Sequence, residues 1–407
     1  MSKVIVIGAG PSGLMAASQA ALYGNSVTLL EKNPRTGRKL IITGKGRCNI
    51  TNACDNQTFI LNVISNPRFL YSAINSFDTS DTISFFNSLG VETKVERGNR
   101  VFPVSDKAMD VADALLAYAK NCGVKILCNT SVKDLILENG AVKGVTDING
   151  KTYSADAVII ATGGKSYPLT GSTGDGYSLA KAAGHSVTDI VASLVPLTLK
   201  GDEPKEMQGL SLRNISVSVT ENGKKVFNDF GELVFTHFGV SGPVILSASA
   251  HLKDYANNNY KLSIDLKPAL DADTLDKRII RDFEKFNLKE VGNSLNELLP
   301  SKLIPVILKR WGIDKTTRCN SITKEQRKAL VEILKNLSFE ITGTRPIEEA
   351  IVTRGGVKTS EINPKTMESK LTKGLYFCGE VIDVDAYTGG FNLQIAFSTG
   401  YLAGQLL

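Results

Sequence analysis

The chain has 407 residues, a length that predicts two or three domains with sizeable cores. Its 42% hydrophobic and 22% charged residues are typical of a soluble globular protein, and no apolar run is long enough to span a membrane. The charge of +6 is mild and no Lys/Arg block accompanies it, so we expect neither a nucleic-acid nor a membrane partner. Six scattered cysteines without C-x-x-C spacing indicate reduced thiols in a cytoplasmic protein, with no disulfide framework and no metal site.

The first thirty-one residues predict a dinucleotide-binding unit. Val4–Ile7 is apolar and β-branched, as a parallel strand buried on both faces should be. The glycines after it have G-x-G-x-x-G spacing: Gly8, Gly10 and Gly13. They allow a tight turn, a close approach of backbone to a pyrophosphate, and packing of the helix expected over 14–23. A second apolar strand, 27–30, ends at Glu31, whose carboxylate can accept hydrogen bonds from an adenosine ribose. The motif does not choose between FAD and NAD(P).

A polar loop rich in hydrogen-bond donors follows over residues 32–54. Backbone amides freed by Gly44 and Gly46, together with Arg and Lys side chains, suit a phosphate or an anionic ring edge. The alternative is a basic surface loop.

The next informative stretch ends a buried strand. Helical patterns and a hairpin turn at 138–140 lead to an apolar strand over 157–160, which runs into Ala161-Thr162-Gly163. Small residues are needed where a chain passes close to a dinucleotide, so this turn favours a second contact with the same ligand. The alternative is an ordinary glycine turn.

The pattern of polar and apolar residues changes at about residue 191. Short alternating strands, among them 225–230 and 232–235, predict an antiparallel barrel-like insertion over 191–268, which we expect to be the substrate domain. A helical subdomain is expected over 269–339.

After residue 339 the sequence is again rich in glycine. A strand ending at Gly379-Glu380, a glycine loop and a small-residue helix over 395–406 predict a second nucleotide-facing turn. The dinucleotide domain is therefore expected to be discontinuous, over 1–190 plus 340–407.

With both ends in view, the chain resembles the BaiN-like family of FAD-binding oxidoreductases, whose members include bile-acid ene-reductases and aminoacetone oxidases. The resemblance covers the whole length, and its most specific motifs are Thr43-Gly-Lys-Gly-Arg-Cys-Asn49 and Gly389-Gly-Phe-Asn392. It implies an α/β fold: a Rossmann-like FAD-binding domain of the two-dinucleotide-fold type, carrying an antiparallel β-barrel and a small helical subdomain.

The resemblance also implies a set of FAD contacts. The pyrophosphate would lie on Gly10 to Leu14, the adenosine ribose on Glu31, the adenine on Val132, and the flavin end on the C-terminal turn. The full expected set is Gly8, Gly10, Pro11, Ser12, Gly13, Leu14, Glu31, Lys32, Arg38, Lys39, Thr43, Gly44, Gly46, Arg47, Cys48, Asn49, Val132, Ala161, Thr162, Gly163, Gly379, Glu380, Asp383, Gly390, Phe391 and Asn392. The loop has Lys45 where some members of the family have glycine, a difference that would place a cation near the flavin and alter substrate choice.

Four side chains are candidates for the chemistry. A cation near the flavin would stabilise the anionic reduced ring, and Lys45 and Arg47 are the candidates for it; the alternative is a structural or dinucleotide-binding role. His237 and Tyr387 are candidate proton donors, although His237 is equally well explained as a strand-end residue. Cys48 lacks the partner cysteine of a flavin disulfide reductase.

Three kinds of function remain open from the residues. The first is reduction of a conjugated C=C bond in a small organic molecule, with NAD(P)H as transient co-substrate, because no second G-x-G-x-x-G supplies an NAD(P) domain. The second is an amine oxidase that passes electrons to O2. The third is an FAD-carrying RNA-modifying protein or a redox-sensing scaffold. The substrate and the oligomeric state are not readable from the sequence.

Overall fold

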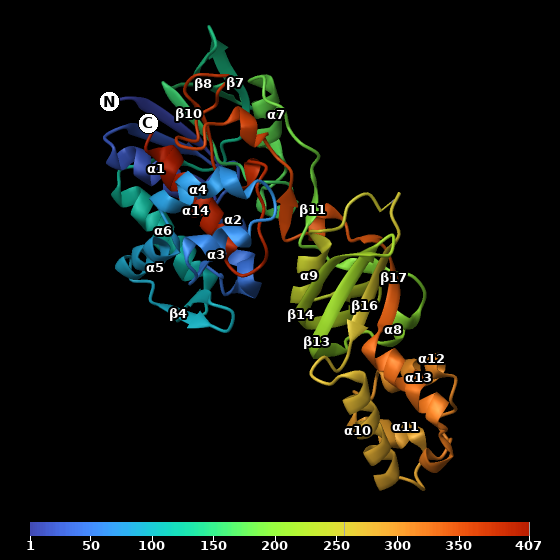
Figure 1. Cartoon of the computed structure of the whole chain (residues 1–407). Helices are drawn as coiled ribbons and strands as arrows, with labels where there is room; N and C mark the ends of the chain where they lie inside the picture. Colours follow the sequence, from blue (N-terminus) through green and yellow to red (C-terminus); the bar gives the residue numbers. More distant parts are fainter. Residues whose placement is uncertain (256, 407) are drawn as a thin grey trace. The chain divides into compact units, whose positions relative to one another are not determined.

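The computed structural model describes residues 1–255 and 257–406, which form two compact units. The first unit contains residues 1–193 and 346–407, so both ends of the chain belong to it, and the second contains residues 194–345 (Figure 1). None of the described helices is long and apolar enough to cross a membrane.

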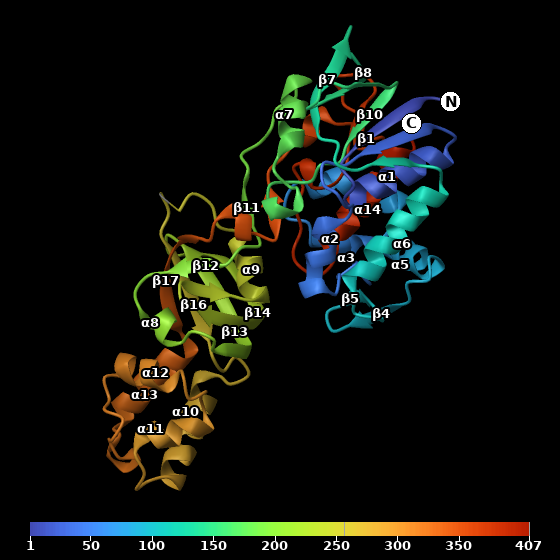
Figure 2. The same ribbon diagram turned by 180° about the vertical axis from the view of Figure 1, so that it is seen from behind.

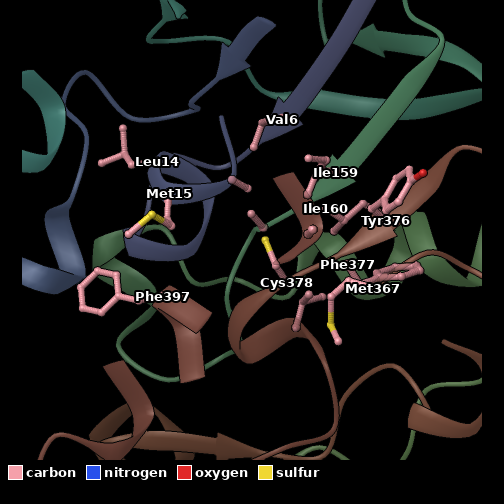
Figure 3. Close-up of a cluster of buried hydrophobic side chains, with 14 of the residues drawn as sticks. Val6, Leu14, Met15, Ile159, Ile160, Met367, Tyr376, Phe377, Cys378 and Phe397 are labelled. Atoms are coloured by element: carbon pink, nitrogen blue, oxygen red, sulfur yellow. The ribbon is translucent and has the colours of Figure 1, made fainter. Parts of the chain in front are cut away.

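A five-stranded parallel sheet organises the first unit. Its order is β19-β10-β1-β2-β6, with the strands at Leu375–Phe377, Ala157–Ile160, Lys3–Ile7, Ser26–Leu30 and Lys125–Leu127. The predicted parallel strands at residues 4–7 and 157–160 are confirmed. Both are buried almost throughout because helices cover the sheet. Figure 3 shows part of this core, with Val6 and Ile159 on the strands and Leu14 and Met15 on the first helix.

Helices α1 (Pro11–Leu22) and α14 (Phe391–Gly404) pack together and join the two ends of the chain (Figure 1). A Cβ added to Gly400 would lie 2.4 Å from the Ser12 carbonyl oxygen, and one added to Gly404 would lie 2.5 Å from that of Ala16. Both contacts advance by four residues in the same direction, so the helices are parallel and their N-termini point the same way.

The other elements of the first unit surround this core. The helices are α2 (Arg38–Ile42), α3 (Asn56–Leu61), α4 (Tyr71–Ser76), α5 (Thr79–Ser88), α6 (Ala108–Asn121) and α7 (Asp175–Ala182). Three small antiparallel sheets complete it: β3 (Thr51–Asn52), β5 (Arg100–Pro103) and β4 (Thr93–Glu96); β7 (Val132–Glu138), β8 (Ala141–Asp147) and β9 (Thr152–Ser154); β11 (Val191–Ser193) and β18 (Val352–Arg354). The predicted turn at 138–140 is confirmed, with Asn139 and Gly140 at positive φ.

The second unit contains a closed antiparallel barrel with strand order β12-β15-β14-β13-β16-β17, seen from behind in Figure 2. These strands are Leu197–Leu199, Gly239–Ser241, Lys224–Thr236, Ser211–Glu221, Tyr260–Asp265 and Leu337–Thr344. The helices are α8 (Glu203–Glu206), α9 (Pro243–Ser249), α10 (Ala272–Lys285), α11 (Val291–Ser294), α12 (Ile304–Trp311) and α13 (Lys324–Lys335).

One strand prediction in the barrel is wrong. The two strands expected at 225–230 and 232–235 are a single strand, β14. The pairing register between β13 and β14 shifts beside Gly231, and the strand passes through this irregularity without ending.

Candidate FAD site

The three N-terminal glycines are needed for different structural reasons. Gly8 has φ +101°, and an added Cβ would lie 2.6 Å from the Ala161 carbonyl oxygen; at Gly13 it would lie 1.9 Å from the Gly8 carbonyl oxygen. The fold itself therefore requires these two. At Gly10 an added Cβ would meet no described atom within 4 Å. Gly10 borders open space, as expected where backbone must approach a ligand.

Gly10 is also the N-cap of α1, and no side chain of the described residues caps this helix end. Its first-turn N–H groups and the positive end of the helix dipole are available to an anion. A pyrophosphate fits this position because it needs donors and tolerates no side chain.

Glu31 closes the second strand of the motif as predicted. Its carboxylate is 7% exposed and accepts hydrogen bonds from the Ala9 N–H at 2.8 Å and from the Asn33 N–H and Nδ2 at 2.8 and 2.7 Å. Because an ionised carboxylate has about four acceptor positions, one remains for a ribose hydroxyl. Neighbouring Lys32 forms an ion pair with Asp175 at 2.6 Å, and Arg38 donates to Asn33 Oδ1 at 2.9 Å.

The turn at Ala161-Thr162-Gly163 lies directly beside the glycine loop. The Ala161 N–H donates to the Ile7 carbonyl at 2.9 Å. Next to it, the Thr162 hydroxyl and the Tyr177 hydroxyl are both buried and have no hydrogen-bond partner among the described residues. Burial raises the pKa of Tyr177, and the charges of Glu380 and Asp383 add to that rise. Buried hydroxyls are normally paired, so two orphans here suit a polar ligand.

An ion pair links α2 to the C-terminal turn. Lys39 Nζ donates to Glu380 Oε2 at 2.7 Å and to the Ser166 hydroxyl at 2.7 Å, and Glu380 Oε1 accepts from the Thr353 N–H at 2.7 Å. Burial alone would raise the pKa of Glu380, but the Lys39 charge and these hydrogen bonds outweigh it and hold the pKa below its usual value. The network joins four segments that are distant in sequence.

The loop after α2 has an unusual backbone. Gly44, Lys45, Gly46 and Cys48 have φ of 57°, 60°, 84° and 61°. Two of the four are not glycine, and the Lys45 side chain is exposed. The loop is thus held in a left-handed conformation that favours glycine.

Arg47 is engaged in this loop by acidic partners. Its guanidinium pairs with Glu96 and with Asp106, at 2.6 Å for the latter, and lies 4.2 Å over the Phe102 ring. The pKa values of Glu96 and Asp106 are lowered, chiefly by hydrogen bonds from Arg47 and Lys94 respectively. These contacts clamp the loop onto β4 and β5, so a role for Arg47 as the flavin cation stays a prediction.

The cysteines of this region are buried. Burial raises the pKa of Cys48 and of Cys378 to about 12, and the Cys378 thiol lies beside Ser12. Neither thiol is a ready nucleophile at neutral pH.

The second glycine turn leads into α14. Gly390, with φ 100°, is the N-cap, and no described side chain caps the helix. The Asn392 side chain holds the preceding loop by accepting from the Ala386 N–H at 3.0 Å and donating to the Ala386 carbonyl at 2.7 Å. At Gly379 an added Cβ would lie 2.4 Å from the Ser12 hydroxyl oxygen, so this turn touches the start of α1.

The helix contacts fix the spacing of the two turns. Gly390 precedes Gly400 by ten residues, whereas Gly10 precedes its contact Ser12 by two. At a rise of 1.5 Å per residue, the start of α14 extends about 12 Å beyond the start of α1.

Three candidates remain: Val132, Tyr387 and His237. Val132 starts β7 and is half-buried. The Tyr387 N–H donates to the Asn62 carbonyl at 3.0 Å, and the residue is partly buried. His237 belongs to the barrel unit, exposed at the β14–β15 turn with its ring against Phe238. Their roles stay predictions.

Sequence reasoning missed the residues that tie the site together: Ser166, Thr353 and Gln394. Each of them bonds to at least one residue 127 or more positions away, and no local pattern signals such a contact.

Comparison with known proteins agrees with this geometry. The family described as "HI0933-like protein Rossmann domain" matches residues 2–406. The chain belongs to this family. It is 33% identical to the 3-dehydro-bile acid delta(4,6)-reductase of Clostridium scindens, covering 100% of this chain and 98% of that protein. It is 34% identical to the ribosomal RNA dihydrouridine synthase of Haemophilus influenzae, covering 98% and 97%, and 32% identical to that of Escherichia coli, covering 98% and 96%.

Solved structures share the fold of this HI0933-like protein. A 3-ketosteroid-Δ4-(5α)-dehydrogenase from Rhodococcus jostii aligns with a TM-score of 0.52 at 14% identity, covering 100% of this chain and 96% of that one. At such identity the likeness shows the fold alone. The likeness agrees with the predicted fold, and the family and its relatives confirm the prediction of an FAD-dependent oxidoreductase.

Proposed function

We propose that this protein reduces a carbon–carbon double bond conjugated to a carbonyl group, with FAD as the resident hydride carrier and NAD(P)H as the electron donor. The names of its relatives support this reaction class. A Δ(4,6) bond in a 3-dehydro (3-oxo) bile acid is conjugated to the 3-carbonyl. The double bond that is lost when uridine becomes dihydrouridine is conjugated to the uracil carbonyl. Two very different substrates thus share one reacting group.

The observation that carries the cofactor assignment is the pair of uncapped glycine helix starts. In the proposal, Gly10 to Leu14 hold the pyrophosphate and Glu31 accepts from the adenosine ribose. Gly390 to Asn392 face the flavin end, where the positive end of the α14 dipole stabilises negative charge. Bound FAD would supply hydride to the substrate carbon β to the carbonyl.

The protein's own tasks are then positioning and charge. The Lys39–Glu380 pair fixes the C-terminal turn against α2, and Lys45 is the exposed cation of the left-handed loop. A proton must also reach the carbon α to the carbonyl, and Tyr387 and His237 remain the proposed donors. No dedicated NAD(P) domain is expected from the sequence, so we propose that NAD(P)H docks transiently.

Two substrate classes compete within this proposal. Identities of 33% and 34% to relatives of different substrate favour neither a steroid-like enone nor a uridine in ribosomal RNA. The mild charge argues for the small molecule, whereas the two RNA-named relatives argue for the nucleic acid that the sequence led us not to expect. An amine substrate with O2 as acceptor is the remaining alternative.

Anaerobic stopped-flow absorbance tests the proposal. The holoprotein is mixed with NAD(P)H, and the reduced flavin is then mixed with a 3-oxo-Δ4,6 steroid or with an unmodified ribosomal RNA transcript. We expect bleaching by NAD(P)H and recovery of the oxidised spectrum with one of the two acceptors. Bleaching only by an amine, with peroxide formed on re-aeration, would overturn the reductase in favour of an oxidase.

A further inference from the structure

Gln394 is a polar side chain inside the core of the first unit. It is fully buried in the first turn of α14. Its Nε2 donates to the carbonyls of Phe77 and Asp78, at 3.1 and 3.0 Å, and to the Ser398 hydroxyl at 2.9 Å. Its Oε1 accepts from the Thr51 hydroxyl at 2.6 Å. The two carbonyls can only accept, so they dictate which end of the amide faces them.

The Thr51 bond connects α14 to the other loop of the site. Thr51 and Asn52 form β3, which follows the left-handed loop. Asn52 Nδ2 donates to the Gly389 carbonyl at 3.0 Å, and a Cβ added to Gly390 would lie 2.3 Å from the Thr51 carbonyl carbon and oxygen. The start of α14 and the end of the 43–52 loop are therefore in backbone contact, and the side chains of Asn52 and Gln394 both form hydrogen bonds across this junction.

We propose that Gln394 is a positioning residue that fixes the N-terminus of α14 against β3 and thereby sets the reduction potential of bound FAD. This inference rests on the proposed cofactor site but not on the identity of the substrate. Helix-end stabilisation of negative charge falls off within one turn, so a small displacement of α14 weakens it. An anionic reduced flavin then loses more stabilisation than the neutral oxidised flavin, and reduction becomes harder.

A loss of folding stability would not by itself change the flavin potential, so the two effects can be measured separately. Gln394→Met keeps the length of the side chain but removes its bonds and leaves two buried carbonyls without that donor. Ser398→Ala is the matched control, because it removes one member of the same network a turn deeper and leaves the Gln394–Thr51 bond in place. Both variants are expected to lose stability in urea.

The measurements are the midpoint potential of the bound flavin, by dye equilibration, and the dissociation constant of FAD, by flavin fluorescence. For Gln394→Met we expect a more negative potential and an FAD dissociation constant about tenfold higher; for Ser398→Ala we expect both to match the wild type. Thr51→Val, which removes only the hydroxyl, should move the potential in the same direction and serves if Gln394→Met does not fold.

Wild-type potential in both Gln394→Met and Thr51→Val would overturn the inference and leave Gln394 a purely structural residue. Failure of the wild-type protein itself to bind FAD would instead overturn the proposed cofactor site.

Discussion

Gly400 lies so close to Ser12 that a Cβ on the glycine would be 2.4 Å from the Ser12 carbonyl oxygen. This contact is the point at which the last helix of the chain meets the first. The hydroxyl oxygen of the same Ser12 would lie 2.4 Å from a Cβ added to Gly379, so three segments meet at one small residue. The spacing of the two glycine turns along the helix axes follows from this packing.

The roles of Gly400 and Gly10 are therefore separable by mutation. Gly400→Ala should lower the free energy of unfolding of the apoprotein by about 1–3 kcal/mol, because backbone must move to admit the methyl group. Gly10→Ala should change it by less than about 1 kcal/mol, because the methyl group enters open space. FAD affinity should instead fall at least about tenfold in Gly10→Ala. Urea unfolding and FAD titration check both; unaltered FAD affinity in Gly10→Ala would place the pyrophosphate elsewhere.

Much of this unit was predictable because its signals are local. An apolar run between glycines predicts β1 and β10, and Asn139-Gly140 predicts a hairpin turn. The last helix was less accurate: it was expected over 395–406 but begins at Phe391, because Gly390 at positive φ starts the helix directly after the turn. Helix α1 likewise begins at Pro11, which is favourable in a first turn.

The Lys39–Glu380 pair makes a prediction about pH. Lys39→Met should lower the free energy of unfolding by about 1–3 kcal/mol at pH 7, since the Glu380 carboxylate is only 19% exposed and loses its charged partner. The pKa of Glu380 is lowered in the folded protein, so the wild type has this stability above pH 4.5 and loses it as pH falls through the folded pKa. The difference between the two proteins should therefore shrink toward pH 4, as urea unfolding at several pH values would show.

Glu380→Gln provides the control for that experiment. In the Glu380→Gln protein, Lys39→Met should lower the free energy of unfolding by less than it does in the wild type, because no carboxylate is left to lose its partner. An equal loss of unfolding free energy in the wild type and in Glu380→Gln would show that Lys39 and Glu380 are not energetically coupled.

Lys45 is a non-glycine residue in the left-handed region, and the cost of this conformation can be measured. Its φ of 60° strains any residue other than glycine, so Lys45→Gly should raise the free energy of unfolding by about 0.5–1 kcal/mol. Lys45→Met keeps the strain and removes only the charge, and it should leave stability near the wild-type value. If Lys45 is the cation near the flavin, both variants should make the flavin potential more negative. A wild-type potential in both would restrict Lys45 to the loop surface.

The sequence predicts the glycine turns of the candidate site but not the side-chain network around them. Glycine patterns located Gly10 and Gly390, but no pattern connects Lys39 with Ser166 or Gln394 with Thr51, because tertiary packing alone brings them together. Arg47 illustrates the converse: its position among polar donors suggested a ligand contact, and the structure shows its charge engaged by Glu96 and Asp106.

His185 gives the protein a pH-dependent stability apart from the site. It is buried, with Nε2 2.7 Å from the Ser369 hydroxyl and Nδ1 3.2 Å from a Glu361 carboxylate oxygen. Burial lowers its pKa, although Glu361 opposes this. The unfolded chain therefore binds this proton more readily, so the stability is present above about pH 6.5 and is lost as pH falls below it. His185→Gln should be less stable at pH 7.5 and show a flatter decline between pH 7 and 5.5 in urea unfolding. His237→Gln, at an exposed position, should retain the wild-type decline, and an identical decline in His185→Gln would assign the effect to other groups.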